Sequence, residues 1–322
     1  MKVKLLLVGI FCLSLLSINA QKTVDATGDV KILESKDSNG WTKVGSIGLD
    51  LASLWLINPR PGAGDNRFGF GGLITYLANY KDTSVIWTNK FGLQEAIVST
   101  AGGPYTKASD VIQFTSQAGH RISEKWYLGG LFDFQTQLLS TYGSNYLSLT
   151  PQGVDPTILK TLTLTSSFFS PATLKLSPGF IYKYDPHLSI FLSPIAIKTI
   201  ICADKTLANT ERFFPNPNHD KTIDFQLGAE VRLDYNNKFA KDRISYIGTL
   251  DLYSNYLRDP QNIAVEWYNT LDFNIIKNFS FIFKSDWFYD NNQLVFLNGD
   301  SNSPGRNVFI RNSLSLGYKH SF

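Results

Sequence analysis

The sequence predicts an all-β protein, namely a transmembrane antiparallel β-barrel of about twelve strands with short periplasmic turns and long extracellular loops. Three observations lead to this fold class. Beyond residue 40, apolar and polar residues alternate with a period of two, which is the period of a half-buried strand. The alternating stretches are longer than the roughly five or six residues of an ordinary strand and match a tilted membrane-spanning one. The connections alternate between short and long, as they do in bacterial outer-membrane barrels.

The composition excludes several other classes of protein. The chain has 322 residues, of which 43% are hydrophobic, 14% aromatic and only 18% charged, whereas globular domains average about 25% charged residues. Its mean hydropathy of -0.09 excludes a polytopic helical membrane protein, because such a protein needs repeated apolar runs of about 20 residues. A formal net charge of +3 is too small to indicate a nucleic acid partner.

The first twenty residues have the pattern of a secretory signal peptide. Lys2 and Lys4 form a positive start, and an apolar run follows over residues 5–18. Ala20 supplies the small residue near which cleavage is expected. We therefore expect residues 1–20 to be removed when the chain is exported.

The remainder of the chain divides into two parts. Residues 21–43 are polar, and we expect a periplasmic N-terminal segment that is extended, disordered or a plug. Residues 44–322 form the predicted outer-membrane barrel. Removal of the signal peptide leaves Cys202 as the sole cysteine, so the exported chain contains no intramolecular disulfide.

The clearest alternation runs from Thr222 to Asn236. Its odd positions are apolar, namely Ile223, Phe225, Leu227, Ala229, Val231, Leu233 and Tyr235. Its even positions are mostly polar or charged, namely Asp224, Gln226, Gly228, Glu230, Arg232 and Asp234. A strand places these two sets on opposite faces, whereas a helix would mix them. We expect the apolar face to contact lipid and the polar face to line the barrel interior.

The same pattern predicts the other strands and their connections. Strands are expected at about 44–57, 67–80, 83–94, 109–119, 125–139, 172–184, 187–200, 222–235, 243–256, 262–275, 279–290 and 308–322. Short connections lie at 81–82, 120–124, 185–186, 236–242 and 276–278. Long connections lie at 58–66, 95–108, 140–171, 201–221 and 291–307, with the compact 257–261 on the same side. An even strand count returns both chain ends to the periplasm.

Aromatic residues gather at both ends of the predicted strands. Near the short turns lie Tyr80, Trp87, Trp126, Tyr184, Tyr235 and Tyr246. Near the long loops lie Trp55, Phe68, Phe70, Tyr256, Trp287 and Tyr289. Two such girdles are typical of the two interfaces of a membrane-embedded barrel. The alternative is a soluble sandwich with these rings in its core.

The last predicted strand resembles the sorting signal of outer-membrane barrels. Leu314, Leu316, Tyr318 and the terminal Phe322 share one face of it. The outer-membrane assembly machinery binds such a strand by pairing with it, which is a form of β-augmentation. We therefore expect the barrel assembly machinery and outer-membrane lipid to be partners of the chain, with an envelope protein complex as a further candidate.

Six short segments carry a family resemblance, namely Trp41–Gly45, Leu77–Lys81, Asp133–Gln137, Leu176–Gly179, Tyr182–Tyr184 and Leu192–Pro194. They resemble a family of uncharacterised outer-membrane β-barrel proteins from Bacteroidota, a domain-of-unknown-function family. The first long loop departs from that pattern, because an Asn-Trp-Ala-Gly-Gly-like stretch is expected where the chain has Leu56–Gly64. The resemblance implies an outer-membrane location and a barrel fold. It implies no activity, since the family has no established one.

A set of charged residues is expected to point into the barrel. Its members are Asp224, Glu230, Arg232, Asp234, Asp251, Glu266, Asp272, Lys284, Asp286, Arg311 and Lys319. Seven of these are acidic and four are basic, so an open interior would favour cations. The alternative is a network of paired charges that fills the interior. Tyr253, Tyr268 and Phe288 are also expected to face inward, and their bulk favours a partly occluded interior.

Residues suited to catalysis or metal binding are scarce. His219, with Asp220 or Asp224 beside it, is the candidate base of a hydrolase, although no nucleophile accompanies it. Asn298–Asn302 is an oxygen-rich segment, either a turn or a Ca²⁺ site. We expect neither a cofactor nor enzymatic activity.

Three functions therefore fit the sequence, all of them in the bacterial outer membrane. The first is a narrow passive channel for small polar or cationic solutes, which the acidic excess of the inner set favours. The second is a non-conducting scaffold or accessory subunit of an outer-membrane protein complex, which the inward aromatic bulk and the long loops at 140–171 and 201–221 favour. The third is an outer-membrane hydrolase that uses His219.

Overall fold

A computed structural model describes residues 39–58, 67–99, 105–142, 146–147, 164–210, 213–276, 278–291, 295–297 and 304–321. The expected signal peptide and most of the expected periplasmic segment lie outside these residues, so both stay predictions. The described part is all-β apart from one helical turn. Among the described residues, no helix is long and apolar enough to cross a membrane.

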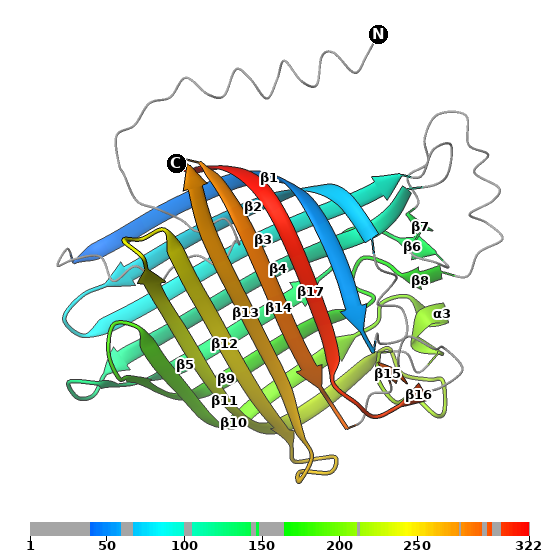
Figure 1. The fold of residues 1–322 in the computed structure, drawn as a ribbon. Helices are drawn as coiled ribbons and strands as arrows, with labels where there is room; N and C mark the ends of the chain where they lie inside the picture. Colours follow the sequence, from blue (N-terminus) through cyan, green and yellow to red (C-terminus); the bar gives the residue numbers. More distant parts are fainter. Residues whose placement is uncertain are drawn as a thin grey trace.

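Twelve long antiparallel strands close into a barrel (Figure 1). They are β1 (Gly40–Ile57), β2 (Arg67–Lys81), β3 (Val85–Ser99), β4 (Tyr105–Arg121), β5 (Trp126–Thr136), β9 (Ala172–Lys183), β10 (Leu188–Ile201), β11 (Ile223–Phe239), β12 (Ile244–Asn255), β13 (Ile263–Ile276), β14 (Phe279–Tyr289) and β17 (Phe309–Ser321). The predicted fold class is confirmed.

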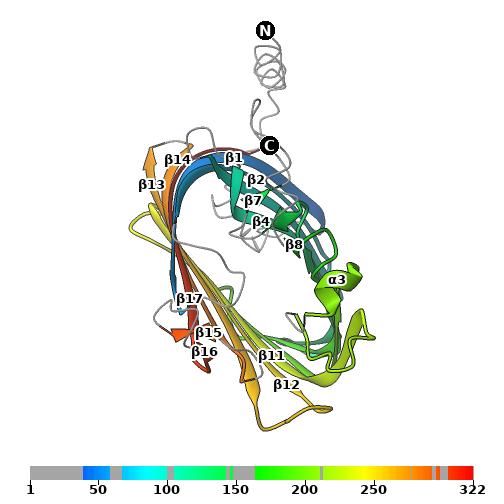
Figure 2. The ribbon, with the colours of Figure 1, turned by 90° about the vertical axis from the view of Figure 1, so that its right-hand side faces the viewer.

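The ring closes where the first long strand meets the last. Each long strand pairs with its neighbours in chain order, and β1 pairs with β17 from Ser46 opposite Ser321 to Ile57 opposite Ile310. Figure 2 shows the resulting ring from one end. Closure leaves none of the twelve strands with an unpaired edge, and this is how barrels avoid edge-to-edge association.

Shorter elements gather at one end of the barrel (Figure 1). They are β6 (Thr141–Tyr142), β7 (Tyr146–Leu147), β8 (Leu164–Ser166), α3 (Lys205–Ala208), β15 (Val295–Phe296) and β16 (Pro304–Gly305). The helical turn α3 lies inside the expected loop 201–221. It forms because the Asp204 carboxylate caps it, accepting hydrogen bonds from the backbone N–H of Thr206 at 2.8 Å and of Leu207 at 3.1 Å.

Two strand boundaries differ from the predicted ones in an informative way. β1 begins at Gly40 rather than at residue 44, so Trp41 and Lys43 belong to the barrel wall. β3 and β4 pair as far as Ser99 opposite Tyr105, past a register shift at Ala96. The connection between them is therefore 100–104 and not the long loop expected at 95–108. At five residues this connection is still longer than its neighbours 82–84 and 122–125, so the expected alternation holds. It is shorter than expected because a bulge lets the two strands continue pairing.

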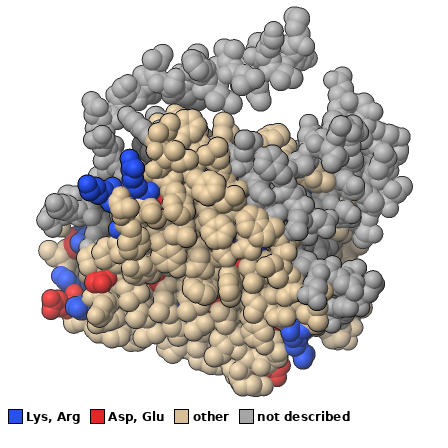
Figure 3. Space-filling model, in the orientation of Figure 1, with Lys and Arg blue, Asp and Glu red and all other residues tan. Residues whose placement is uncertain are grey.

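The outer face of the barrel is apolar. On β13, Ile263, Trp267 and Ile275 are 41–55% exposed, whereas Thr270 and Asp272 between them are 3% and 1% exposed. Figure 3 shows the consequence on one face, where charged side chains gather towards the ends and a broad uncharged band lies between them. Two expected girdle residues at the short-turn end, Tyr235 and Tyr246, lie 5.9 Å apart between ring centroids. A third, Trp126, lies 4.8 Å from Tyr182, which was not among the expected ones.

Part of the barrel interior is also apolar. Tyr127 and Leu131 of β5, Ile181 of β9 and Phe191 of β10 form one cluster, with Ile86 of β3 packed against it. Leu131, Ile181 and Phe191 are at most 1% exposed. On this wall the inward side chains are therefore packed against one another. The expectation of a wholly polar inner face is wrong here, because inward positions of a small barrel fill the available volume as a core does.

Two prolines interrupt the neighbouring strands β9 and β10. The register shifts between Ser193 and Ala196 of β10, around Pro194, and the Ser193 hydroxyl donates to the backbone oxygen of Pro178 at 2.7 Å. A bulge accommodates Pro194 because the extra residue has no partner in the ladder. Gly179 is required beside it, since a Cβ there would lie 2.2 Å from the backbone oxygen of Leu192. These irregular segments border the charged site described next.

Candidate functional site

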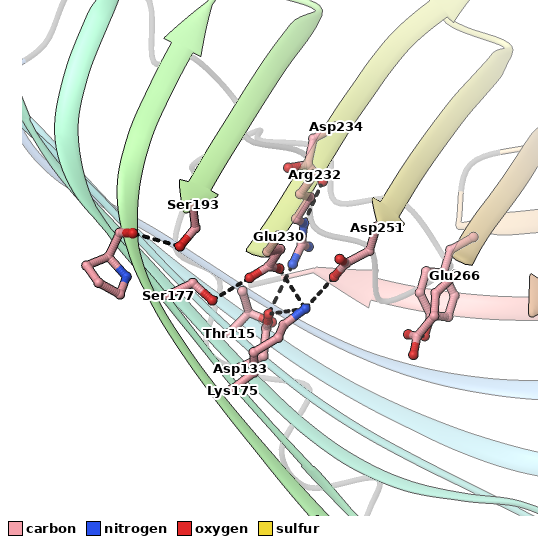
Figure 4. A network of polar contacts seen from close by, with 12 residues as sticks. Thr115, Asp133, Lys175, Ser177, Ser193, Glu230, Arg232, Asp234, Asp251 and Glu266 are labelled. Carbon is pink, nitrogen blue, oxygen red and sulfur yellow. Dashed lines mark hydrogen bonds and ion pairs between the residues drawn. The ribbon is translucent and has the colours of Figure 1, made fainter. Parts of the chain in front are cut away.

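A lysine inside the barrel is surrounded by carboxylates from three other strands. The Nζ of Lys175, on β9, lies 2.6 Å from Oε1 of Glu230 and 2.5 Å from Oδ2 of Asp251. Oδ2 of Asp133 is 3.9 Å away. Figure 4 shows these side chains converging from β5, β9, β11 and β12. The lysine and glutamate side chains are 12% and 0% exposed, so the charges are held away from bulk water.

An arginine extends this network along the wall. Arg232 Nη1 lies 3.3 Å from Oδ2 of Asp133, and its Nε lies 3.2 Å from Oδ1 of Asp234. Asp133 therefore lies between the two cations, and Asp234 forms the far end of the network (Figure 4). We call these six residues the Lys175 network: Asp133, Lys175, Glu230, Arg232, Asp234 and Asp251.

Neutral hydroxyl groups hold the carboxylates in place. Thr115 donates to Oδ1 of Asp133 at 2.7 Å, and Thr249 donates to Oδ1 of Asp234 at 2.9 Å. The Ser177 hydroxyl, next to the β10 bulge, donates to Oε2 of Glu230. Buried carboxylates need such donors because an unsatisfied buried charge is costly. The network has four carboxylates and two cations, so its net formal charge is negative.

Strand register explains why these groups meet. Asp133 is directly opposite Lys175 in the β5–β9 ladder, and Arg232 is directly opposite Asp251 in the β11–β12 ladder. Opposed residues in a sheet share a face and lie close enough for side-chain contact. Lys198 of β10 is opposite Lys175, and its Nζ instead lies over the ring of Tyr253 at 5.3 Å. The two lysines are thereby directed to different partners.

A second charged cluster lies on β13, β14 and β17. Arg311 contacts Oδ2 of Asp286 through Nε at 3.0 Å and Nη2 at 2.7 Å. The guanidinium carbon lies 5.4 Å from the Phe288 ring, which is 5.5 Å from the Tyr268 ring. The Tyr268 hydroxyl donates to Oε2 of Glu266 at 2.6 Å. Aromatic side chains therefore fill this part of the interior between the charges.

Most of the charged residues expected to face inward lie on the less exposed side of their strands. Asp224 is 8% exposed and contacts Arg258 at 3.2 Å, and Asp272 is 1% exposed. Lys284 is half-buried, opposite Thr270 in the ladder. The side chain of Lys319 lies outside the described residues. Glu230, Arg232, Asp234 and Asp251 meet in the Lys175 network, whereas Asp286 and Arg311 meet elsewhere.

Two central residues of the site were not among those expected. Lys175 and Asp133 each alternate with apolar neighbours, Lys175 between Leu174 and Leu176, and Asp133 between Phe132 and Phe134. That alternation is the signal that identifies them. With Lys175, Lys198 and Asp133 included, the count becomes eight acidic to six basic residues. Outside the Lys175 network four acidic residues balance four basic ones, so the remaining acidic excess lies within that network.

The predicted sorting residues lie on the last strand as expected. Leu316 and Tyr318 are 48% and 42% exposed on the outer face. Tyr318 lies 5.2 Å from Phe279 of the neighbouring strand β14, between ring centroids. Leu314 shares this face, opposite Phe283. Phe322 lies outside the described residues, and recognition by an assembly machinery stays a prediction.

The structure adds nothing in favour of a hydrolase. His219 is exposed, and within the described residues no hydrogen bond joins its side chain to a carboxylate or hydroxyl group. Asp224 instead accepts hydrogen bonds from Gln226 at 2.7 Å and from Arg258 at 3.2 Å. No group of three or more potential metal ligands occurs among the described residues. Asn298–Asn302, the candidate calcium segment, lies outside them.

Comparison with known sequences gives a partial family match. Residues 58–142 match a family described as "Protein of unknown function (DUF3078)". Two of the segments that carry the resemblance, Leu77–Lys81 and Asp133–Gln137, lie within this span. The resemblance to an uncharacterised family is therefore supported over β2–β5, whereas a Bacteroidota source stays a prediction. No curated protein matches the chain significantly.

Comparison with solved structures finds other barrels at low similarity. The NanC porin has a TM-score of 0.40 and 8% identity over 84% of this chain and 98% of its own. The COG4313 outer membrane channel from Pseudomonas putida F1 has a TM-score of 0.40 and 13% identity over 88% and 97%. The translocator domain of autotransporter NalP from Neisseria meningitidis has a TM-score of 0.38 and 10% identity over 88% and 90%. At these values, the fold assignment rests on the strand pairing of the chain itself.

Proposed function

We propose that the protein is an integral β-barrel of the bacterial outer membrane. The apolar outer face of the closed ring supports this, because water would solvate such a surface poorly and lipid would cover it. The aromatic contacts at the short-turn end, such as Trp126 with Tyr182, match an interfacial girdle. Membrane fractionation tests the location: the protein should cosediment with outer-membrane markers and resist extraction by alkaline carbonate. Release by carbonate would contradict it.

Within that membrane, the barrel forms a narrow passive path for small polar or cationic solutes. The observation that carries this proposal is the Lys175 network, in which four carboxylates face two cations inside the barrel. Its less buried carboxylates are Asp133 and Asp234, at 18% and 24% exposed, and charged side chains that line a constriction favour ions of the opposite sign. The packed cluster around Phe191 limits the passage to small solutes.

Single-channel recording in planar bilayers tests the path. We expect small current steps in KCl, and under a salt gradient a reversal potential shifted towards that of the cation. Heat-modifiable migration on SDS gels first verifies that the barrel is folded. A folded barrel that gives no current steps would reject conduction, and a reversal potential shifted towards the anion would reject cation preference alone.

A non-conducting scaffold is the second candidate function. The burial of Leu131, Ile181 and Phe191 to at most 1% exposure favours it, because side chains that exclude water also block ions. The short elements gathered at one end of the barrel offer a surface for other envelope proteins (Figure 1). Chemical cross-linking in cells, followed by purification of the barrel, tests this function. Recovery of the lone barrel under conditions that cross-link known envelope complexes would count against it.

A further inference from the structure

We propose that the outer face of β1–β4 binds one anionic glycerophospholipid of the periplasmic leaflet. This inference rests on the proposed membrane location. An open groove of about 330 Å³ lies on this face, lined by Trp41, Lys43, Tyr76, Ala78, Asn89, Phe91 and Phe114. No residue of the groove belongs to the Lys175 network, and the two sites lie on opposite faces of the barrel wall.

The floor of the groove is formed by small residues between larger ones. Ala78 of β2 is directly opposite Lys43 of β1 and Asn89 of β3. Tyr76, two residues further along the same face, is opposite Gly45 on one side and Phe91 on the other. Ala78 has only a methyl group and the adjacent Gly45 has no side chain, so the neighbouring rings border a hollow. A hollow of this shape on a lipid-facing wall accommodates a chain-like apolar ligand.

Polarity changes along the groove in the order that a phospholipid requires. Nearest the short-turn end, Trp41 lies 5.4 Å from both Tyr80 and Trp87, between ring centroids. The next row contains Lys43 and Asn89. Beyond it lie rings and then aliphatic side chains, namely Tyr76, Phe91, Phe114, Ile47, Ile74, Leu93 and Ile112. The polar row suits a headgroup, and the apolar rows suit acyl chains.

The polar row is held together by hydrogen bonds. The Trp87 indole N–H donates to the Ser116 hydroxyl at 2.9 Å, and that hydroxyl donates to Oδ1 of Asn89 at 2.8 Å. The Asn89 amide nitrogen therefore faces Ala78, whose backbone oxygen is 3.5 Å away. One N–H of this amide donates to the Ala78 oxygen, and the second is left as a donor for a ligand in the groove. A phosphate oxygen is the complementary acceptor.

Lys43 supplies the charge that selects an anionic ligand. Its side chain is exposed, with Nζ 6.0 Å from the centroid of the Trp41 ring. Within the described residues, no carboxylate lies within ion-pair distance of it. Lys43 is three residues into β1, so its backbone lies within ~10 Å of the strand end at ~3.3 Å per residue. This depth corresponds to the headgroup region, where a lysine stem packs on apolar surface while its ammonium group meets phosphate.

The opposite end of the same face is built differently. Asp110 accepts hydrogen bonds from the backbone N–H of Leu138 at 2.7 Å and of Leu139 at 2.9 Å. Lys107 donates to Oε1 of Gln137 at 3.1 Å. The chain after β5 therefore supplies partners for charged groups at that end. At the short-turn end no segment of the described chain supplies such a partner for Lys43, so its ammonium group is available to a lipid headgroup. Short turns face the periplasm in outer-membrane barrels, so the site is assigned to the periplasmic leaflet.

Native mass spectrometry of the full-length barrel in detergent, titrated with phosphatidylglycerol, tests the proposal. We expect one phosphatidylglycerol to bind more tightly than phosphatidylcholine. Lys43→Gln should weaken this first binding event about fivefold, the effect of one lysine at an anionic lipid surface. Ala78→Phe, which fills the floor of the groove, should abolish it. Lys241→Gln, at an exposed lysine in the turn between β11 and β12, is the matched control and should bind as the wild type does.

Three results would overturn the proposal. The first is unchanged phosphatidylglycerol binding by both Lys43→Gln and Ala78→Phe in barrels that retain heat-modifiable migration. The second is equal affinity for phosphatidylcholine, because the ammonium group would then have no role. The third is displacement of the lipid by excess inorganic phosphate, which would assign the site to a soluble anion. A barrel that resists carbonate extraction but fails this test loses only the lipid site, whereas release by carbonate removes the membrane location itself.

Discussion

Two walls of the barrel interior carry charge in different ways. On the Lys175 wall, formed by β5, β9, β11 and β12, two cations contact four carboxylates and the hydroxyl groups of Thr115 and Thr249 complete the network. On the Arg311 wall, formed by β13, β14 and β17, Arg311 meets Asp286 in a single pair beside aromatic rings. The difference teaches that the excess of negative charge lies on one wall, and that the other wall mainly fills space.

The largest effect is expected from Lys175→Met. Without the ammonium group, Glu230 and Asp251 remain as buried carboxylates with no cation in contact, which costs about 3–5 kcal/mol of unfolding free energy. Urea unfolding in lipid vesicles, followed by tryptophan fluorescence, measures it. Lys198→Met on the opposed strand is the control and should cost below about 1 kcal/mol, because its recorded contact is with the Tyr253 ring. The double variant Lys175→Met/Glu230→Gln should recover part of the loss.

On the other wall, Arg311→Met should cost less. The Arg311 side chain is 39% exposed, so water partly screens its pair with Asp286, and we expect a loss of about 1 kcal/mol in the same urea assay. Asp286→Asn in the same background should change little further. A loss as large as that of Lys175→Met would show that the two walls are equivalent and would end the comparison.

The comparison also predicts which carboxylates set ion preference. Asp234→Asn, on the Lys175 wall, should lower the cation-to-anion permeability ratio by about twofold, the effect of one unit charge at ~10 Å in water. The double variant Asp286→Asn/Arg311→Met should leave the ratio unchanged, because it removes an ion pair whose net charge is zero. Reversal potentials under a KCl gradient measure both variants. An equal fall in both would place the preference in the whole interior rather than on one wall.

The smallest effects are expected at two short turns, the one between β2 and β3 and the one between β9 and β10. Asp82 accepts backbone N–H groups from Ser84 at 2.7 Å and Val85 at 2.6 Å, and these lower its pKa below the ordinary 3.8. The same bonds from His187 and Leu188 lower the pKa of Asp185. A carboxyl group whose pKa is lower in the folded state than in the unfolded state stabilises the fold at pH values above its unfolded-state pKa. That contribution is lost as the pH falls through the folded-state pKa.

Asp82→Ala and Asp185→Ala should therefore each be slightly less stable than the wild type at neutral pH. The deficit should shrink as the pH falls below 3.8, and it should be similar for the two variants because the turns have the same geometry. Urea midpoints measured between neutral and strongly acidic pH provide the check. A deficit that grows on acidification would contradict the assigned sign.

The alternation of residues predicts the barrel wall well and the interior contacts poorly. Alternation identified each of the twelve strands. It places Glu230 and Arg232 on one face of β11, and Asp251 shares that face because the next strand, β12, pairs directly with β11. It does not reveal that Lys175 on β9 reaches Asp251 on β12. That contact spans two intervening strands, so it depends on the curvature of the ring and on side-chain reach, neither of which is written in a local pattern.

The apolar part of the interior was missed for a related reason. Leu131 lies between Gly130 and Phe132, and Ile181 lies between Phe180 and Tyr182, so neither has a polar neighbour that marks its face. Only the ladder positions show that both point inward. The helical turn α3 was missed because four residues, Lys205–Ala208, are too few to establish a helical period.

The closure of β1 on β17 has a consequence for how fast the chain folds. Ser46 pairs with Ser321, so the last ladder to form joins segments from nearly opposite ends of the polypeptide. To form contacts of such high sequence separation, the chain first loses the conformational entropy of a loop nearly as long as the protein. The contacts stabilise the fold only after this loop has closed. Folding should therefore be slow, and an intermediate that lacks only this ladder would expose two open edges until it closes.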